Sequence, residues 1–307
     1  MKLKNIILII CSGSLSLATY TSNAAEIFSD SFEAGDMSTT NADGFSWGKN
    51  NKTSIVTQHP KDGPVALYNN KPIYKIHSAT TPDGAIKNWV AKDGKNSLRF
   101  HYSAGESWAE QRFNLGKEQP EIWVSFWLRV PTNFKHNITG KDNNKLFAIY
   151  MDGYERMGQG TTSVWEFWPD KSGGSVIAQR YRNEANRYNS GHKNYTSFIK
   201  YPDDQGRWMQ LVFHIKAETT NNANNGVMQL WRKWEGEKFI QLHDWNNLDL
   251  HTPTATPGFL HGYVMGWSNP TYLADTDWLM DNFNLSTTPF DFLVKPNPPN
   301  SITVTTK

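Results

Sequence analysis

Residues 121–130 read EIWVSFWLRV, and their pattern indicates the class of fold. Apolar side chains occupy every second position, namely Ile122, Val124, Phe126, Leu128 and Val130. The positions between them hold Trp123, Ser125, Trp127 and Arg129. A period of two is that of a β-strand with one buried face and one mixed face. The stretch therefore predicts a strand that covers one side of a hydrophobic core.

The same alternation recurs along the chain. Residues 208–216 read WMQLVFHIK, with Met209, Leu211, Phe213 and Ile215 on one face. Similar segments cover residues 97–102, 108–115, 145–151, 163–168, 176–182, 227–234, 238–243, 262–267 and 278–286. Residues 27–33 resemble a first strand, and residues 180–187 a loop or short turn. Many short strands separated by Gly, Asn, Asp and Pro clusters predict an all-β protein, a single antiparallel β-sandwich.

The first 25 residues have the features of a secretory signal. Lys2 and Lys4 precede an apolar run, and the small residues Ala24 and Ala25 follow it. This order predicts a signal peptide at residues 1–25 and export to the periplasm or beyond a bacterial cell. A lipoprotein signal at Cys11 is disfavoured because the residue before it, Ile10, is not small. We expect the sandwich at residues 26–292 and a flexible tail at 293–307.

Charge argues against some classes of partner. The chain has 31 Lys+Arg and 29 Asp+Glu, and without Lys2 and Lys4 the two counts are equal. A neutral chain gives no general support for binding nucleic acid, and no later segment is apolar for long enough to span a membrane. Nucleotide and dinucleotide fingerprints are absent, so we expect no organic cofactor. The protein is expected to be a monomer.

Short motifs carry a resemblance to a known group. They are residues 30–33 (DSFE), 206–213 (GRWMQLVF), 225–231 (NGVMQLW) and 281–283 (DNF). These motifs resemble the concanavalin A-like jelly rolls, and are most similar to bacterial polysaccharide lyases of the heparinase-type, alginate and glucuronan-lyase groups. The resemblance implies a concave sheet that grips an extended glycan. It also implies β-elimination on a uronic-acid polymer.

Such a lyase neutralises the sugar carboxylate, removes the adjacent proton and protonates the leaving oxygen. Arg99 and His101 alternate with apolar residues, and Arg112 occupies the polar face of the next strand. We expect Arg99 and Arg112 to neutralise the carboxylate and His101 or Tyr181 to carry the proton. Gln179 joins them because residues 179–181 (QRY) match, without its histidine, the Gln-x-His strand of the family.

Further residues are assigned to substrate binding. They are Glu110, Lys145, Tyr150, Glu166 and Trp267. Glu110 and Arg112 stand in the reverse order of the family's Arg-x-Glu motif. Alternation groups Tyr150 with Leu146 and Ala148, which also allows it to point into the core. Arginine and glutamate on neighbouring strands are more often ion pairs than catalysts, and most tryptophans of a sandwich pack within it.

Acidic residues near both ends allow a structural calcium site. Asp30 and Glu33 lie near the start and Asp281 near the end, where adjacent strands would bring their oxygens together. Ordinary acidic turn and edge residues explain the same pattern equally well.

Two other functions remain open beside a lyase: a non-catalytic glycan-binding module or lectin, and a structural surface or matrix protein. A hydrolase is disfavoured because the paired-carboxylate motif of jelly-roll glucanases is missing.

Overall fold

The computed structural model describes residues 26–37, 44–58, 89–138, 143–155, 160–182, 196–252 and 258–293. It also describes the backbone of short strands between residues 61 and 87 and at 188–189. The predicted signal peptide, and residues 294–307 of the predicted tail, lie outside the described residues. Within the described part of the chain, none of the helices has the length and apolar character needed to cross a membrane.

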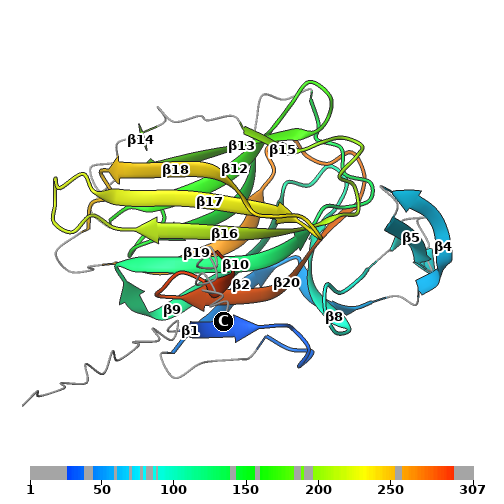
Figure 1. Ribbon diagram of the computed structural model, residues 1–307, viewed down its shortest axis with the longest axis horizontal. Coiled ribbons are helices and arrows are strands. Elements are labelled where there is room, and N and C mark those ends of the chain that lie inside the picture. Colours follow the sequence, from blue (N-terminus) through cyan, green and yellow to red (C-terminus); the bar gives the residue numbers. More distant parts are fainter. Residues whose placement is uncertain are drawn as a thin grey trace, which may run out of the picture.

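Two antiparallel sheets stack face to face (Figure 1). The first consists, in spatial order, of β18 (Ile240–Leu248), β17 (Gly226–Trp234), β16 (Trp208–Lys216), β10 (Glu121–Arg129), β20 (Thr276–Ser286), β8 (Asn96–Tyr102) and β3 (Thr53–Thr57), with β1 (Glu26–Asp30) beside β20. The second consists of β14 (Tyr188–Asn189), β13 (Ser175–Arg182), β12 (Thr162–Pro169), β11 (Asn144–Tyr150), β19 (Phe259–Trp267), β9 (Trp108–Gln119) and β2 (Ser46–Asn51), with β15 (Thr196–Ile199) beside β13.

Two small hairpins and one short helix complete the described elements. The hairpins are β4 (Lys61–Tyr68) with β5 (Lys71–Ile76), and β6 (Ala79–Thr80) with β7 (Ile86–Lys87). A 3₁₀ helix covers Asp291–Leu293. The predicted class, an antiparallel jelly-roll β-sandwich, is confirmed by this arrangement. The strand β13 runs through Arg182, so the predicted loop over residues 180–187 is wrong for its first three residues.

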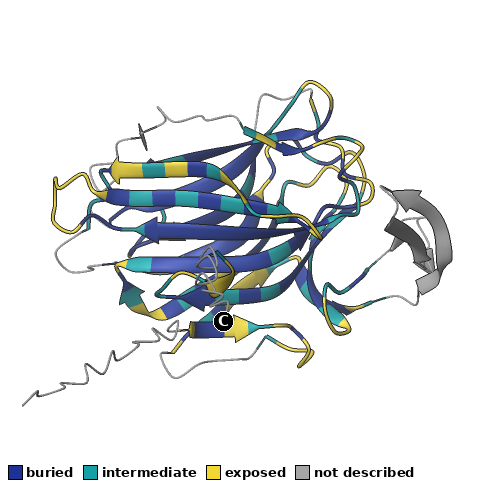
Figure 2. Ribbon diagram, in the orientation of Figure 1, coloured by how far each residue is buried: buried dark blue, intermediate teal, exposed yellow. Residues whose placement is uncertain are grey.

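The core lies between the two sheets, as the alternation in residues 121–130 requires. Ile122, Val124, Phe126 and Leu128 of β10 are fully buried. The ring of Phe126 packs at 5.6 Å from that of Phe213, which lies 4.4 Å from Phe147 of the opposite sheet. Figure 2 shows the same alternation along β17, where buried and half-buried positions follow one another. Burial of these rings from both sheets is the main stabilising contribution to the sandwich.

A β-bulge in β11 determines which of its side chains face outward. Lys145 pairs with Glu166 but Phe147 pairs with Trp165, so the register shifts between them. Leu146 and Phe147 therefore both lie in the core. An extra residue reverses the alternation that follows it. As a result, Lys145, Ala148 and Tyr150 share the outer face of the second sheet, and the alternation that would place Tyr150 with Leu146 does not hold.

Candidate functional site

Polar side chains gather on the outer face of the second sheet, which we call the polar face. They come from β9, β11, β12, β13 and β19 and from the loop after β11. They are Glu110, Arg112, Lys145, Tyr150, Tyr154, Glu155, Glu166, Arg180, Arg182, His261 and Tyr263. With His261 neutral, four cationic side chains face three carboxylates. The face is therefore suited to a substrate that carries negative charge.

One row of cross-strand neighbours runs across this face. It contains Arg112, Tyr263, Ala148, Val164 and Arg180, each paired with the next in the sheet register. Neighbours of this kind lie about 5 Å apart. The small side chains of Ala148 and Val164 thus separate Tyr263 from Arg180. The row therefore has an arginine at each end and a short apolar stretch between the two arginines.

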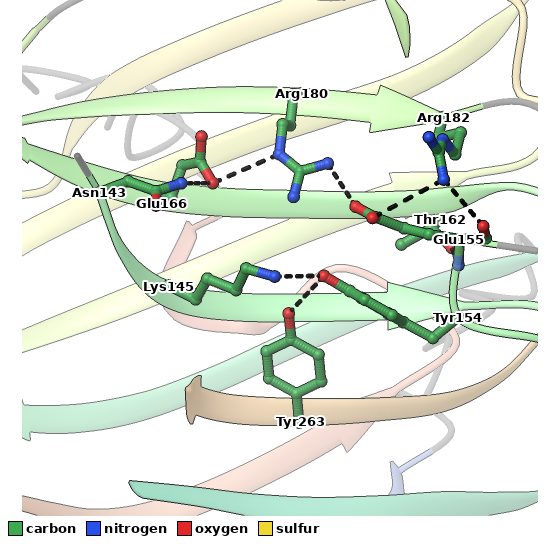
Figure 3. Close-up of polar contacts among 9 residues, drawn as sticks. All are labelled: Asn143, Lys145, Tyr154, Glu155, Thr162, Glu166, Arg180, Arg182 and Tyr263. Carbon is green, nitrogen blue, oxygen red and sulfur yellow. Dashed lines mark hydrogen bonds and ion pairs between the residues drawn. The ribbon is translucent and has the colours of Figure 1, made fainter. Parts of the chain in front are cut away.

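Lys145, Tyr154 and Tyr263 form a hydrogen-bonded group at the centre (Figure 3). The Nζ of Lys145 donates to the phenolic oxygen of Tyr154 over 2.6 Å, and the Tyr263 hydroxyl donates to the same oxygen over 3.1 Å. Burial raises the pKa of Tyr263 well above its usual value, and Tyr154 adds to the shift. Tyr263 is therefore a protonated donor at neutral pH. Because the Tyr154 oxygen accepts both bonds, its own proton is directed elsewhere.

Arg112 is the accessible cation of the polar face. Its Nε lies 2.5 Å from Glu110 Oε1, and its side chain is 47% exposed whereas that of Glu110 is 5% exposed. Burial by itself would lower the pKa of Arg112, but the hydrogen bond and charge of Glu110 outweigh it and raise the pKa. Glu110 therefore holds one edge of the guanidinium and leaves the remaining donors facing solvent.

Arg180 is held far more tightly. It donates to Glu155 over 2.5 Å and to Glu166 over 3.3 Å, and Asn143 donates to the same oxygen of Glu166. Burial acts to lower the pKa of Arg180, but the two carboxylates reverse the shift and raise it. Arg182 donates to the backbone oxygen of Glu155 over 2.8 Å. The network fixes the loop after β11, which carries Tyr154, to β13 (Figure 3).

His261 and Tyr150 form the next row of the face, and their rings stack at 5.5 Å. Burial lowers the pKa of His261, so its imidazole is neutral at neutral pH. Burial also raises the pKa of Tyr150, although Arg112 acts in the opposite direction. Both groups are uncharged and offer hydrogen-bonding atoms beside Arg112.

Two tryptophans adjoin the polar face beyond Glu110. Trp267 and Trp108 are register partners whose rings are parallel within 8° at 5.4 Å. Trp267 is 44% exposed, so much of its surface is open to a ligand. An exposed, preorganised indole suits stacking on a sugar ring.

The predicted catalytic residues on β8 and β9 lie in different sheets. Arg99 and His101 belong to β8 of the first sheet, whereas Arg112 belongs to β9 of the second. The chain passes from one sheet to the other between these strands, so consecutive strands present their polar sides on opposite surfaces of the sandwich. His101 pairs with Asp277 at 2.7 Å, next to Trp89. The prediction that Arg99, His101 and Arg112 form one group is wrong.

Gln179 and Tyr181 also lie away from the polar face. Tyr181 is a member of the hydrophobic core, and Gln179 is buried on the same side of β13. A strand alternates its side chains, so Arg180, between them, points outward. The prediction that Gln179 and Tyr181 share a face with Arg112 is wrong, because Arg180 and Arg182 lie on the outer side of β13 and Gln179 and Tyr181 on the inner side. The predicted binding residues Glu110, Lys145, Tyr150 and Glu166 do lie on the polar face, with Trp267 beside it.

The predicted calcium ligands do not converge. Asp30 accepts hydrogen bonds from the Phe32 amide and the Trp47 indole. Glu33 accepts from the amides of residues 95 and 96, and Asp281 from those of 92 and 93. Among the described residues, Asp30, Glu33 and Asp281 do not form a group with metal-ligand spacing, and calcium binding itself stays a prediction. Glu218, Asp249 and His251 do have this spacing, but backbone amides already occupy both oxygens of Glu218.

Several residues of the polar face carry a weak sequence signal or none. Tyr154 and Glu155 lie in the loop after β11, where no periodicity marks them. His261 begins the outward side of β19, outside the predicted limits of that strand. Arg180 and Arg182 have a signal, since the core positions Ile177 and Tyr181 show which side of β13 faces inward.

The chain was compared with protein families, with curated protein sequences and with solved structures. No family model matches the chain, and no curated protein sequence matches it. Among solved structures, alginate lyase Aly36B is similar with a TM-score of 0.48 and 12% identity, over 76% of this chain and 96% of that one. Alginate lyase vAL-1 from Chlorella virus has a TM-score of 0.45 and 12% identity, over 69% and 89%. Cellulose-induced protein Cip1 has a TM-score of 0.40 and 14% identity, over 85% and 97%. Two of these similar structures are thus alginate lyases, each 12% identical to this chain.

Proposed function

We propose that this protein is a secreted lyase that cleaves a uronic-acid-containing polysaccharide by β-elimination at the polar face. The observation that supports the proposal best is the hydrogen-bonded group of Lys145, Tyr154 and Tyr263, flanked in the sheet by Arg112. It combines a proton-transfer group with a cation for the sugar carboxylate. The secreted location rests on the sequence of residues 1–25.

Arg112 is assigned to the carboxylate of the sugar. Removing the proton next to a carboxylate builds negative charge on its oxygens, so a positive group that binds them lowers the barrier. Arg112 has nearly half of its side chain exposed, whereas Arg180 has 14% exposed and is committed to two glutamates. A guanidinium also matches the geometry of a carboxylate.

Tyr154 is assigned to proton transfer. Tyr154 first gives its own proton to solvent. The phenolate oxygen then takes the proton from the carbon next to the carboxylate, a carbon–carbon double bond forms, and the bond from carbon to the glycosidic oxygen breaks. The proton then passes from Tyr154 to the leaving oxygen. The hydrogen bonds from Lys145 and Tyr263 hold this oxygen in one position on the polar face. A substrate lying on the sheet meets this group from one side only, so one tyrosine serves as base and acid.

The test is a lyase assay on the full secreted chain with alginate, glucuronan and a heparinoid, followed by ultraviolet absorbance of the unsaturated ends. We expect absorbance to rise on at least one polymer and to slow at least 100-fold in Lys145→Met. Lys135→Met is the matched control, because Lys135 lies over Tyr201 rather than in the polar face, and it should retain the rate. No rise on any uronate polymer would overturn the proposal.

A second candidate is a glycan-binding module without catalysis. It is favoured by the stacked pair of Trp108 and Trp267, since this pair needs no chemistry to bind sugars. Polymer binding that persists in gel-mobility assays, without any absorbance change, would support it. A structural surface or matrix protein would show neither.

A further inference from the structure

A cavity of about 400 Å³ lies away from the polar face, between β15 and β17. Its lining includes Ser197 of β15, Arg232 of β17, residues of the turn before β16 and Glu237 of the turn after β17. Since β15 belongs to the second sheet and β17 to the first, the cavity joins the two sheets. The volume is in the range of small-ligand sites.

Arg232 is the buried cation of this cavity. The residue is 8% exposed and points to the inner side of its sheet, among alternating core positions. Its guanidinium lies 5.0 Å from the ring of Trp234 and 5.8 Å from that of Phe198. Two aromatic contacts hold the planar group in place.

The hydrogen bonds of Arg232 are incomplete. Its Nη1 donates to the backbone oxygen of Phe198, whereas Nε is buried and has no partner. Among the described residues no ion pair joins Arg232 to a carboxylate. A buried donor without an acceptor costs about 1–3 kcal/mol, and more when the group is charged. Burial lowers the pKa of Arg232, and the charges of Asp204 and Glu237 offset this only in part.

The nearby carboxylates are committed to Arg207 instead. Its Nη1 lies 2.5 Å from Asp204 and its Nη2 lies 2.7 Å from Glu237. The second oxygen of Asp204 accepts the amide of Lys200 over 2.8 Å. Arg207 therefore has its ion pairs within the cavity. The edge of Arg232 formed by Nε and Nη2 has no acceptor.

A purely structural role explains Arg232 less well. The hydrogen bond that connects β17 to β15 uses one N–H donor, at Nη1, whereas a guanidinium has five N–H donors. The free edge offers two parallel N–H groups, the arrangement that binds a carboxylate. Asp203, Asp204 and Glu237 around it would repel a doubly charged anion, and Asp203 and Asp204 offer oxygens that accept hydrogen bonds from hydroxyl groups.

We propose that this cavity binds a sugar acid, with the carboxylate on Arg232 and the hydroxyl groups on Asp203 and Asp204. The site is separate from the polar face. Ligand binding in this cavity does not depend on the proposed lyase activity, because sugar acids are components of every uronic-acid-containing glycan.

The experiment is isothermal titration calorimetry with sodium glucuronate, carried out in an Arg112→Gln background so that the exposed cation of the polar face does not contribute. We expect glucuronate to bind at least 10-fold more tightly than glucose, which lacks the carboxylate, and than inorganic phosphate, which the acidic residues repel. Equal binding of glucose, or tighter binding of phosphate, would overturn the assignment of a sugar acid.

Two substitutions with opposite expected signs locate the site. Arg232→Gln should weaken glucuronate binding at least 10-fold, and Glu237→Gln should strengthen it several-fold by removing a competing charge. Glu237 is exposed, so that variant tests the proposal even where Arg232→Gln does not fold. Lys171→Gln, an exposed change elsewhere, is the control and should leave the affinity unchanged. Unchanged affinity in Glu237→Gln would contradict the proposal.

Discussion

The Nζ of Lys145 donates a 2.6 Å hydrogen bond to the phenolic oxygen of Tyr154, linking the outward side of β11 to the loop that follows it. The contact exists because the bulge at Leu146 leaves Lys145 on the same face as Tyr150. The Tyr263 hydroxyl reaches the same oxygen from β19. Three segments of chain thus meet at one atom, which makes Tyr154 the side chain whose removal is most informative.

Tyr154→Phe should lower kcat on the responsive polymer at least 100-fold and leave KM nearly unchanged. The reason is that a positioned proton-transfer group contributes about 10²–10⁴-fold, while its ring still packs. Steady-state kinetics measure both constants. Tyr201→Phe removes a hydroxyl outside the polar face and should leave both constants as they are. A Tyr154→Phe enzyme with normal kcat would exclude Tyr154 as the proton carrier.

Arg180→Met should lower the free energy of unfolding by about 3 kcal/mol, since it leaves the nearly buried carboxylate of Glu166 without its ion-pair partner. Urea denaturation measures the change. The double variant Arg180→Met/Glu166→Met should recover part of this loss, because the unpaired charge is gone as well. A double variant less stable than the sum of the two single changes would show that the pair does not act in this way.

Acid should destabilise the fold through His136. Burial against Phe134 and Phe167 lowers the pKa of His136 to about 4, from 6.5 in the unfolded chain. Between these values the unfolded state binds the proton and the folded state does not, so stability falls as the pH falls from 6.5 towards 4. The loss from this residue is about 3 kcal/mol.

Urea unfolding at a series of pH values, compared between the natural protein and His136→Gln, isolates this effect. The variant should lose less stability across the window because glutamine does not titrate. Equal pH dependence in the two proteins would show that His136 is charged in the folded state.

Trp267→Ala should raise KM, or weaken polymer binding, by about 2–10-fold with little effect on kcat, as expected for a stacking contact of about 0.5–1.5 kcal/mol. The indole is 44% exposed, so the melting temperature should change little. Affinity electrophoresis in polymer-containing gels measures the binding. Leu273→Ala, at an 82% exposed position, serves as the control. Unaltered mobility shifts in Trp267→Ala would remove the tryptophan pair from the binding surface.

The local sequence pattern is enough to specify the class of fold. Alternation in residues 121–130 and 208–216 specifies which side chains are buried, because a strand with a continuous apolar face has to pack that face against another layer. The structure buries Ile122, Val124 and Phe126 as this rule requires. The same local rule identified Glu110 and Arg112 as outward neighbours on one strand, and their ion pair confirms that placement.

Which outward-facing side chains share a surface depends on how the strands pair and pack. The alternation of apolar residues predicts that His101 and Arg112 both point away from the core. It does not predict that β8 and β9 belong to different sheets. It also fails where a bulge shifts the register, as at Leu146, and it says nothing of a loop residue such as Tyr154. Periodicity is a property of neighbouring residues, whereas the polar face is assembled by pairing between strands distant in sequence, and that pairing is set by the packing of the whole sandwich.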